Sequence, residues 1–356
     1  MTGELQTGTD GTLSATAPTE PPTGEERPIL TIAIPTYNRP EQLQRIVKQL
    51  LEQRSRLWKL VVIDNCSDVP SASLLPNDVH VIRNRTNVGI VGNVNRCFEL
   101  CDTPYIGVFG DDDYVTPTAI EDILAVIADY PDAAVINFSM TRLQSSRTAP
   151  ISCHGIDEFL EKCDNFEHLL WLSGLVFSKV HYWPYLRMIY TFGYSTAGQM
   201  VLTLATLVGG NTCILHPKIV TGTNEAERGE VGWSVSDIRT CVTTLLDIPM
   251  PKQSRRALSR LLRRDFIKFQ SDLLFLSFAM DSRHARDAYY LYMVRWTHMV
   301  LAERSMLLAL KVLCAAVLLR SSWFRRSFRG LTKLLKERIT GRPFVEPKSA
   351  ERLERV

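Results

Sequence analysis

Short runs of apolar residues alternate, along the first 140 residues, with segments whose apolar positions recur every three or four residues. Residues 29–34 are almost continuously apolar, which is typical of a β-strand buried on both faces. Pro40 suits the first position of a helix. The apolar positions that follow it form the stripe of one buried helical face, and they are Leu43, Ile46, Val47, Leu50 and Leu51.

The same alternation continues to residue 138. Further strands are predicted at residues 59–63, 79–82, 105–109 and 133–138. Helices with one apolar face are predicted after residues 90 and 120, the second capped by Thr116 and Pro117. Strands joined mostly by helices predict an α/β fold with a mostly parallel sheet and right-handed crossovers.

Four of the predicted strands lead directly into polar clusters. The clusters are residues 36–39, 64–68, 84–93 and 111–113. Ligands of parallel sheets bind outside the carboxyl ends of the strands, so we expect one polar ligand site there, with independent solvated turns as the alternative. This half contains no G-x-G-x-x-G and no P-loop motif, which disfavours classical dinucleotide and P-loop binding.

The last of these clusters is three consecutive aspartates, Asp111, Asp112 and Asp113, which follow Gly110. Adjacent carboxylates repel one another unless a cation or solvent relieves the repulsion. A hard divalent cation binds through one or two carboxylates together with substrate phosphates. The cluster therefore predicts a site for Mg²⁺ or Mn²⁺, with a solvated acidic turn as the alternative.

The order of motifs resembles the family 2 glycosyltransferases. The motifs are Ala-Ile-Pro-Thr-Tyr-Asn-Arg at 33–39, Val-Ile-Asp-Asn-x-Ser at 62–67, Asn-x-Gly-x-x-x-Asn at 87–93 and Gly-Asp-Asp-Asp at 110–113, with Pro117 four residues on. The resemblance covers residues 29–140 and implies the GT-A fold.

The resemblance also implies a nucleotide-sugar donor and assigns residues to it. The base would lie near Thr36, Tyr37 and Asp64, and Mg²⁺ or Mn²⁺ on the aspartates would hold the diphosphate. The full set of donor-binding residues that it implies is Pro35, Thr36, Tyr37, Asn38, Asp64, Asn87, Gly89, Asn93, Asp111 and Trp233.

One position departs from the family pattern, Asp-x-Asp-Asp. Alignment through Pro117 places Gly110 at the first aspartate. Asp112 then matches the metal-binding carboxylate and Asp113 the residue after it, so both are predicted to be catalytic. Asp111 is the second candidate metal ligand. A Gly-Asp-Asp-Asp version resembles transferases of bacterial surface-polysaccharide assembly.

The second half of the chain does not identify a catalytic base. Residues 171–178 resemble the segment that opens the acceptor side, or else form a buried strand. Residues 200–208 predict an apolar helix, and Gln199 before it cannot act as a base, which an inverting transferase needs. The loop from residue 221 resembles the mobile loop over the donor, with Trp233 a sugar-stacking ring or a packing residue. The nearby titratable residues are His216, Glu225, Glu227 and Glu230.

Charge is distributed unevenly along the 356 residues. Residues 250–356 carry 23 Lys and Arg against 9 Asp and Glu, whereas the chain as a whole has a net charge of +3. Helices are predicted at residues 255–280, 283–303, 305–320 and 323–339. Basic residues around apolar stripes indicate helices that lie on an anionic membrane surface. Helices packed on the catalytic domain are the alternative, and a nucleic-acid partner is disfavoured.

These patterns predict three regions. Residues 1–28 form a disordered leader without signal-peptide features, residues 29–250 the GT-A domain, and residues 251–356 a basic amphipathic helical region. Within the domain, residues 29–140 are the nucleotide-binding half and residues 141–250 the acceptor half. The eight cysteines lack C-x-x-C or zinc spacing, which favours a reducing cytoplasm, and we expect placement at the inner face of the cytoplasmic membrane.

The leading hypothesis is a metal-dependent, inverting glycosyltransferase of the hexosyltransferase type. It would move a sugar from a nucleotide-sugar to a membrane-associated glycan or a polyprenyl-linked acceptor. The main alternative is a catalytically inactive nucleotide-binding scaffold of the same fold. Nucleotidyl transfer is a further alternative, but residues 35–40 contain neither the glycine nor the lysine of a typical phosphate loop.

Overall fold

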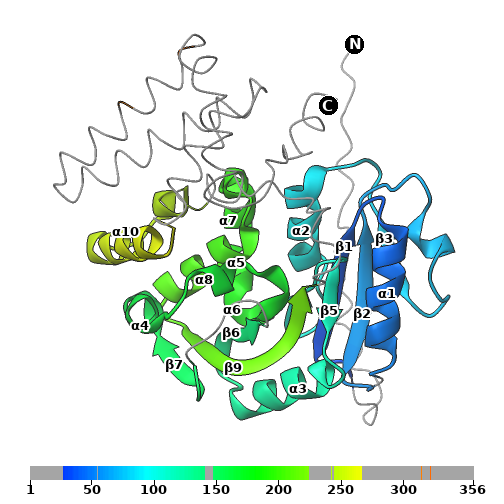
Figure 1. Ribbon diagram of the computed structural model, residues 1–356, viewed down its shortest axis with the longest axis horizontal. Coiled ribbons are helices and arrows are strands. Elements are labelled where there is room, and N and C mark those ends of the chain that lie inside the picture. The colour runs from blue at the N-terminus through cyan, green and yellow to red at the C-terminus, as the bar shows by residue number, and fades with distance from the viewer. Residues whose placement is uncertain are drawn as a thin grey trace, which may run out of the picture.

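The computed structural model describes residues 27–53, 55–140, 147–223, 242, 244–266, 314 and 321. These residues form three layers, a central sheet with helices on both faces (Figure 1). The strand order is β3-β2-β1-β4-β8-β6-β9-β5, and β7 pairs with β9.

The first half follows the predicted alternation of strands and helices. Its elements are β1 (Leu30–Thr36), α1 (Pro40–Leu51), β2 (Trp58–Asp64), η1 (Ser71–Ser73), β3 (His80–Arg83), α2 (Gly89–Glu99), β4 (Tyr105–Val108), β5 (Asp113–Val115), α3 (Ala119–Asp129) and β6 (Ala133–Met140). Strands β3, β2, β1 and β4 are parallel neighbours, which confirms the parallel sheet for these four strands, whereas β5 is antiparallel to β9 and β6 is antiparallel to β8.

The second half adds further helices, two four-residue strands and the twelve-residue strand β9. Its elements are β7 (Ile151–His154), α4 (Gly155–Lys162), α5 (Glu167–Leu170), η2 (Leu172–Gly174), β8 (Leu175–Ser178), α6 (Lys179–Tyr182), η3 (Trp183–Tyr185), α7 (Leu186–Thr191), η4 (Gly193–Ser195), α8 (Gly198–Val208), β9 (Thr212–Thr223), η6 (Leu245–Asp247) and α10 (Lys252–Phe266).

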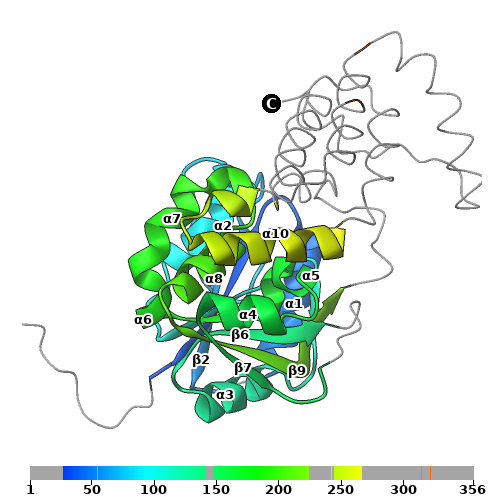
Figure 2. The ribbon, with the colours of Figure 1, turned by 90° about the vertical axis from the view of Figure 1, so that its left-hand side faces the viewer.

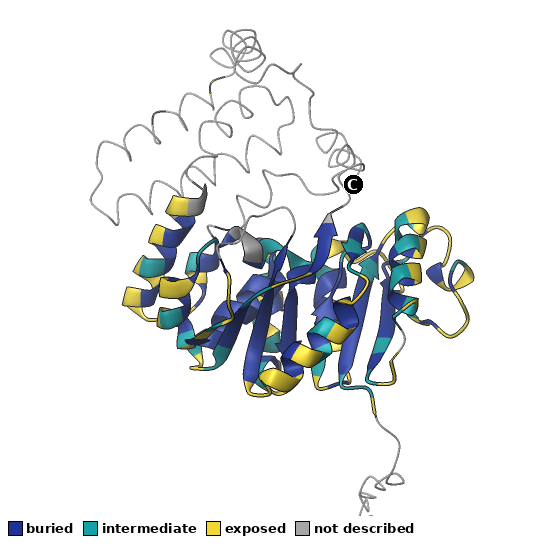
Figure 3. Cartoon of the chain, turned by 60° about the horizontal axis from the view of Figure 1, so that its bottom comes forward, coloured by how far each residue is buried: buried dark blue, intermediate teal, exposed yellow. Residues whose placement is uncertain are grey.

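Two hydrophobic clusters, one on each face of the sheet, hold the layers together. Along β1, Leu30, Ile32 and Ile34 pack into the cluster under α1 and α3. Ala33 points to the opposite cluster, which contains the buried faces of α2, α4, α8 and α10. The strands are therefore buried on both sides while the helices expose one face, as the burial colours show (Figure 3).

The buried-strand alternative for residues 171–178 is correct from Leu175 to Ser178. These residues form β8, which runs antiparallel between β4 and β6, so the sheet is mixed at this point. One local prediction differs from the structure, because the helix after the aspartates begins at Ala119 with Thr118 as its N-cap, two residues later than predicted. Thr116 instead continues the pairing of β5 by donating its backbone N–H to Val220.

Helix α10 packs on the rest of the domain. Leu258, Leu261 and Leu262 are buried in the same cluster as α4 and α8, and Figure 2 shows α10 crossing that face. The apolar side of this helix is therefore not available to a membrane, so packing is the correct alternative here. Among the described residues, no helix is both long and apolar enough to span a bilayer. The predicted helices beyond residue 266 and the leader before residue 27 lie outside the described residues.

Candidate active site

The ends of the parallel strands bring the four polar clusters to one edge of the sheet. Thr36 at the end of β1 is in register with Asp64 at the end of β2. Asp64 is in turn in register with Arg83 at the end of β3. Beyond the end of β4, the aspartates reach the same edge, because Asp111 contacts Thr36. The predicted convergence of the clusters is thus present.

Buried amide side chains tie the ends of these strands to α2. The Asn84 side chain donates to Asn65 at 3.0 Å and to Asn93 at 2.8 Å. Asn93 donates at 3.0 Å to the carbonyl of Ile63, the residue before the end of β2. Asn93 therefore stabilises the loops of the site from a buried position and is not exposed to a ligand.

Asn87 and Gly89 lie on the exposed side of this network. The side-chain oxygen Oδ1 of Asn87 accepts from the Asn65 side chain at 2.7 Å and from the Gly89 backbone N–H at 2.8 Å. Gly89 has φ of 75°, a conformation that suits glycine, and α2 begins there. The predicted motif residues thus form the turn that starts α2.

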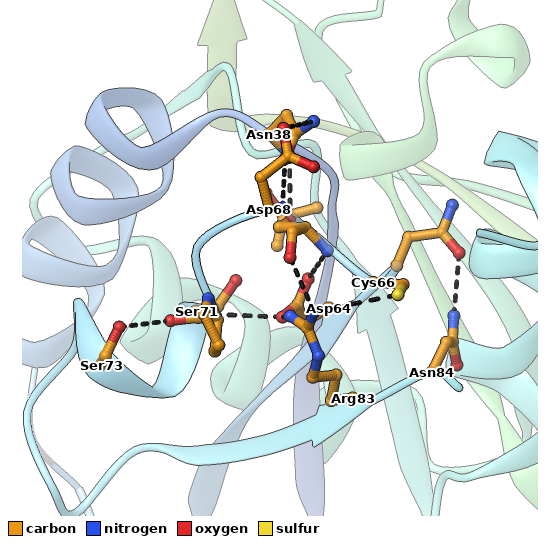
Figure 4. A network of polar contacts seen from close by, with 12 residues as sticks. Asn38, Asp64, Cys66, Asp68, Ser71, Ser73, Arg83 and Asn84 are labelled. Carbon is orange, nitrogen blue, oxygen red and sulfur yellow. Dashed lines mark hydrogen bonds and ion pairs between the residues drawn. The ribbon is translucent and has the colours of Figure 1, made fainter. Parts of the chain in front are cut away.

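Asp64 is enclosed by the loop that follows it (Figure 4). Its carboxylate is fully buried and accepts from the backbone of Ser67 and Ser71 and from Arg83, with the Arg83 Nη1 at 2.5 Å. Burial alone would raise the pKa of Asp64, but the hydrogen bonds from Ser67, Ser71 and Arg83 hold it below its usual value. Asp64 is therefore an ionised anchor for this loop.

Asn38 connects the loops that follow β1 and β2. It adopts φ of 52°, which asparagine tolerates, and its side chain both donates to the Asp68 carboxylate and accepts from the Asp68 backbone. Next to it, Tyr37 is 41% exposed and Pro35 is half-buried. The ring of Tyr37 is thus accessible to a planar ligand at the rim.

The three aspartates have different surroundings. Asp111 is buried, and its two carboxylate oxygens accept from the Thr36 hydroxyl at 2.8 Å and from Arg39 at 3.0 Å. Burial raises the pKa of Asp111, and Arg39 opposes that rise. The Asp112 side chain is 42% exposed and lies 2.9 Å from the same Arg39 nitrogen. Asp112 is therefore the accessible carboxylate of the cluster.

Asp113 lies beneath the turn. Its buried carboxyl group contacts the Ser173 hydroxyl and accepts from the Gly110 backbone at 3.2 Å. Burial raises the pKa of Asp113 to about 8, and the hydrogen bond with Ser173 opposes the rise. A Cβ atom at Gly110 would lie 2.8 Å from the Asp113 carboxylate, so this packing requires the glycine that departs from the family pattern.

The residues at this edge fit a cation that is shared with a ligand. Within the described ranges, no three acidic, histidine or cysteine side chains converge on one point that could hold a metal ion. Mg²⁺ and Mn²⁺ suit oxygen ligands, and Mg²⁺ is usually held by one or two carboxylates plus substrate phosphates. Asp112, with Asp111 behind it, supplies that smaller set.

Two candidates from the second half have partners outside the aspartate turn. Gln199 is buried and donates to the carbonyl of Leu170 at 3.0 Å. His216 lies on β9, where its ring packs beside Phe138 and accepts from the Lys218 N–H at 3.2 Å. Trp233 and Glu225, Glu227 and Glu230 lie outside the described residues.

Sequence reasoning assigned no role to three side chains that the structure brings into this network. Arg39 bridges two aspartates, Arg83 pairs with Asp64, and Ser173 contacts Asp113. Arg39 stands inside a quoted motif and Arg83 ends a predicted strand, so position could have suggested both. Ser173 lies 60 residues from its partner, and no local pattern indicates that contact.

The fold and the position of the acidic turn define the class of protein. A mostly parallel sheet flanked by helices, with carboxylates beyond the ends of its strands, is the GT-A type of glycosyltransferase fold. Residues 31–190 match the family described as glycosyl transferase family 2.

Two relatives show how far the sequence similarity extends. The chain is 31% identical over 114 residues to an uncharacterised glycosyltransferase of Haemophilus influenzae, a match that covers 31% of this chain and 37% of that protein. It is 29% identical over 107 residues to the putative colanic acid biosynthesis glycosyl transferase WcaA of Escherichia coli, covering 28% and 38% respectively. Each match thus spans less than two fifths of the relative.

Solved structures show the same fold over more of the chain. TarS 1–349 of S. aureus in complex with UDP is similar with a TM-score of 0.56 and 13% identity, covering 90% of this chain and 95% of that one. The same protein in complex with UDP-GlcNAc gives a TM-score of 0.54 at 13% identity, covering 89% and 93%. At this identity the likeness concerns the fold.

Proposed function

We propose that this chain is an inverting glycosyltransferase that moves a hexosyl group from a nucleotide-sugar to a glycan or a polyprenyl-linked acceptor. The observation that carries the proposal is the convergence of four polar clusters at one sheet edge, with the Asp112 carboxylate accessible beside Arg39. The family of residues 31–190 supports this reaction class.

The described residues suggest how a donor would be held. Tyr37 offers an exposed ring to the base, and Asp64 with Arg83 fixes the loop beside it. Asp112 would hold Mg²⁺ or Mn²⁺, with Asp111 behind it. When bound, such a cation offsets the negative charge that develops on the leaving diphosphate.

Asp113 has a supporting role in this proposal. Its carboxyl group is buried and bonded to Ser173, so it fixes the aspartate turn without contacting the donor. The acceptor hydroxyl must lose a proton to a base as it attacks the anomeric carbon from the face opposite the diphosphate. The base remains unassigned, because the His216 ring contacts Phe138 and Lys218 and the acidic residues after 223 lie outside the described ranges.

The acceptor proposal rests on the bacterial relative and on charge. WcaA is named for colanic acid biosynthesis, which favours a surface-polysaccharide intermediate as the acceptor. We propose that this intermediate is carried on a membrane lipid and that the protein is cytoplasmic and acts at the inner face of the membrane. The basic residues Lys252, Arg255, Arg256 and Arg260 are exposed on the outer side of α10 and offer an anionic leaflet a basic surface.

A panel of donors tests the reaction. The full-length chain is incubated with UDP-, GDP- and dTDP-sugars, with Mg²⁺ or Mn²⁺ or with EDTA, and released nucleoside diphosphate is measured. We expect release from one donor that depends on the cation. Asp112→Asn should reduce it by at least about a hundredfold, because the accessible carboxylate is lost. Asp78→Asn, at an exposed carboxylate outside the site, is the matched control.

The panel also separates the two main alternatives. Tight nucleotide binding without release from any donor, even with membrane extract supplied as acceptor, would favour the catalytically inactive scaffold. Full activity in Asp112→Asn would contradict the assignment of this carboxylate to the cation.

A further inference from the structure

Strand β5, which begins at Asp113, is held from two sides. One edge pairs with β9, from Asp113 opposite Thr223 to Val115 opposite Thr221. β5 is the last strand in the order of the sheet, so its other edge has no strand neighbour among the described residues. That edge faces α1, and side chains of α1 take the place of the missing strand.

Two side chains on one side of α1, and the side chain of Gln53 just beyond the C-cap Glu52, contact the backbone of this segment. Arg45 donates to the Asp112 carbonyl at 3.1 Å and stacks over the Tyr114 ring at 4.8 Å. Gln49 accepts from the Val115 N–H at 3.1 Å. One turn further on, Gln53 donates to the Thr116 carbonyl at 2.9 Å and accepts from the Ile120 N–H at 3.0 Å.

The spacing of these residues explains how they act together. Positions 45 and 49 are four residues apart on α1, which places their side chains above one another. Gln53 is the first residue after the C-cap Glu52 and continues the same spacing. The helix itself is fixed, since its apolar face, at Leu43, Ile46, Val47 and Leu50, is buried under the sheet. A rigid row of side chains thus holds backbone groups at residues 112, 115, 116 and 120.

We propose that Arg45, Gln49 and Gln53 are positioning residues for Asp112. Their hydrogen bonds fix the position of the aspartate turn relative to α1. Helix α1 begins after its N-cap Arg39, whose guanidinium lies between Asp111 and Asp112. One helix thereby fixes both the cation-binding carboxylate and the arginine next to it. This inference rests on the proposed function, because it assigns these residues to the donor site.

The contacts favour positioning over general stabilisation. Gln49 and Gln53 contact backbone atoms in the segment that follows Asp112, and Arg45 contacts the Asp112 carbonyl itself. A displaced turn would move the Asp112 carboxylate relative to Thr36 and Arg39 while the sheet pairing with β9 remains. The affinity for the cation should therefore fall in variants that still fold.

Gln49 offers a clean test. Gln49→Leu keeps the helix and removes the acceptor for the Val115 N–H, whereas Gln49→Glu keeps an acceptor. Gln44→Leu is the matched control, the same change on the same helix at a side chain that contacts the Leu74 carbonyl instead. Mn²⁺ affinity is measured by electron paramagnetic resonance of free Mn²⁺, with the nucleoside diphosphate that the donor panel identifies. Thermal unfolding and the split between kcat and KM are measured in parallel.

We expect Gln49→Leu to bind Mn²⁺ about tenfold more weakly, the equivalent of roughly one net hydrogen bond. Gln49→Glu and Gln44→Leu should stay within about twofold of the wild-type affinity. If Gln49→Leu does not fold, Gln53→Glu is measured in its place. That variant keeps the Ile120 contact and loses the Thr116 contact, and it should also weaken Mn²⁺ binding.

Two outcomes overturn the inference for different reasons. Wild-type Mn²⁺ affinity in a folded Gln49→Leu or Gln53→Glu protein would show that α1 only stabilises the fold. A wild-type chain that neither binds Mn²⁺ with any nucleoside diphosphate nor releases one from any donor would overturn the proposed function, and the inference with it.

Discussion

The three adjacent aspartates lie in different surroundings, which reduces the repulsion between their carboxylates. Asp111 is buried against Arg39, Asp112 faces solvent, and Asp113 is buried beside Ser173 with a raised pKa. Asp111 and Asp112 thus share Arg39 as a cationic partner, Asp112 also meets water, and Asp113 holds a proton near neutral pH. Only the middle residue is left accessible to a ligand.

The raised pKa of Asp113 predicts a dependence of stability on pH. Below about pH 4 the group is protonated in both folded and unfolded chains and adds no such dependence. Between about 4 and 8 only the folded chain keeps the proton, so stability falls as pH rises, by up to about 1.4 kcal/mol per pH unit from this group. Asp113→Asn should lose this dependence, because an amide does not ionise.

Thermal unfolding at several pH values between about 5 and 8 measures the effect. The midpoint of Asp113→Asn should rise relative to that of the wild type as pH increases. Any constant change from altered hydrogen bonding with Ser173 shifts the variant equally at every pH, so the slope is diagnostic. Parallel pH profiles for the two proteins would contradict a neutral Asp113.

At the scale of elements, the sequence predicted the strands and helices whose hydrophobic pattern lies within one short segment. Residues 29–34 and the stripe from Leu43 to Leu51 are correct within a residue or two, because a buried strand and a one-sided helix have distinct periods. Strands β5 and β8 have three and four residues, too few to show a period. Their places depend on pairing with β9, β4 and β6, which no local pattern encodes.

The same limit applies to the site. The four polar clusters and their common edge follow from the alternation of strands and helices, so the motif residues could be placed at that edge from their positions in the chain. The different surroundings of Asp111, Asp112 and Asp113 could not be predicted from those positions, because they depend on contacts with Ser173 and Arg39 and on burial. Contacts between residues far apart in the chain decide which carboxylate is open.

Helix α10 gives a prediction at this scale. Leu262 is buried against the domain, so Leu262→Ala should lower the free energy of unfolding by about 2–4 kcal/mol. Arg260→Ala, two residues earlier on the exposed side, should change it by less than about 0.5 kcal/mol. Chemical denaturation measures both. Equal stability of Leu262→Ala and the wild type would mean that this apolar face is free for another partner.

At the scale of the whole molecule, charge and packing separate two kinds of membrane contact. The buried leucines of α10 exclude insertion of its apolar face, whereas its outer side keeps four basic residues exposed. Residues 250–356 carry 23 Lys and Arg against 9 Asp and Glu, so attraction to an anionic surface is the form of contact that this region favours. Such attraction is weakened by salt, because the charges lie at the surface.

Sedimentation with vesicles tests this electrostatic contact. The full-length chain should sediment with vesicles containing phosphatidylglycerol, stay in solution with phosphatidylcholine alone, and leave the anionic vesicles at about 0.5 M salt, where screening acts within a few ångströms. Combining Arg255→Gln, Arg256→Gln and Arg260→Gln should weaken binding at least about tenfold, since each basic residue near the leaflet contributes about 1 kcal/mol. Gln253→Ala on the same helix is the control. Binding that persists in high salt, or that is equal on both lipids, would mean that apolar contacts hold the protein and that the basic side of α10 does not direct it to the membrane.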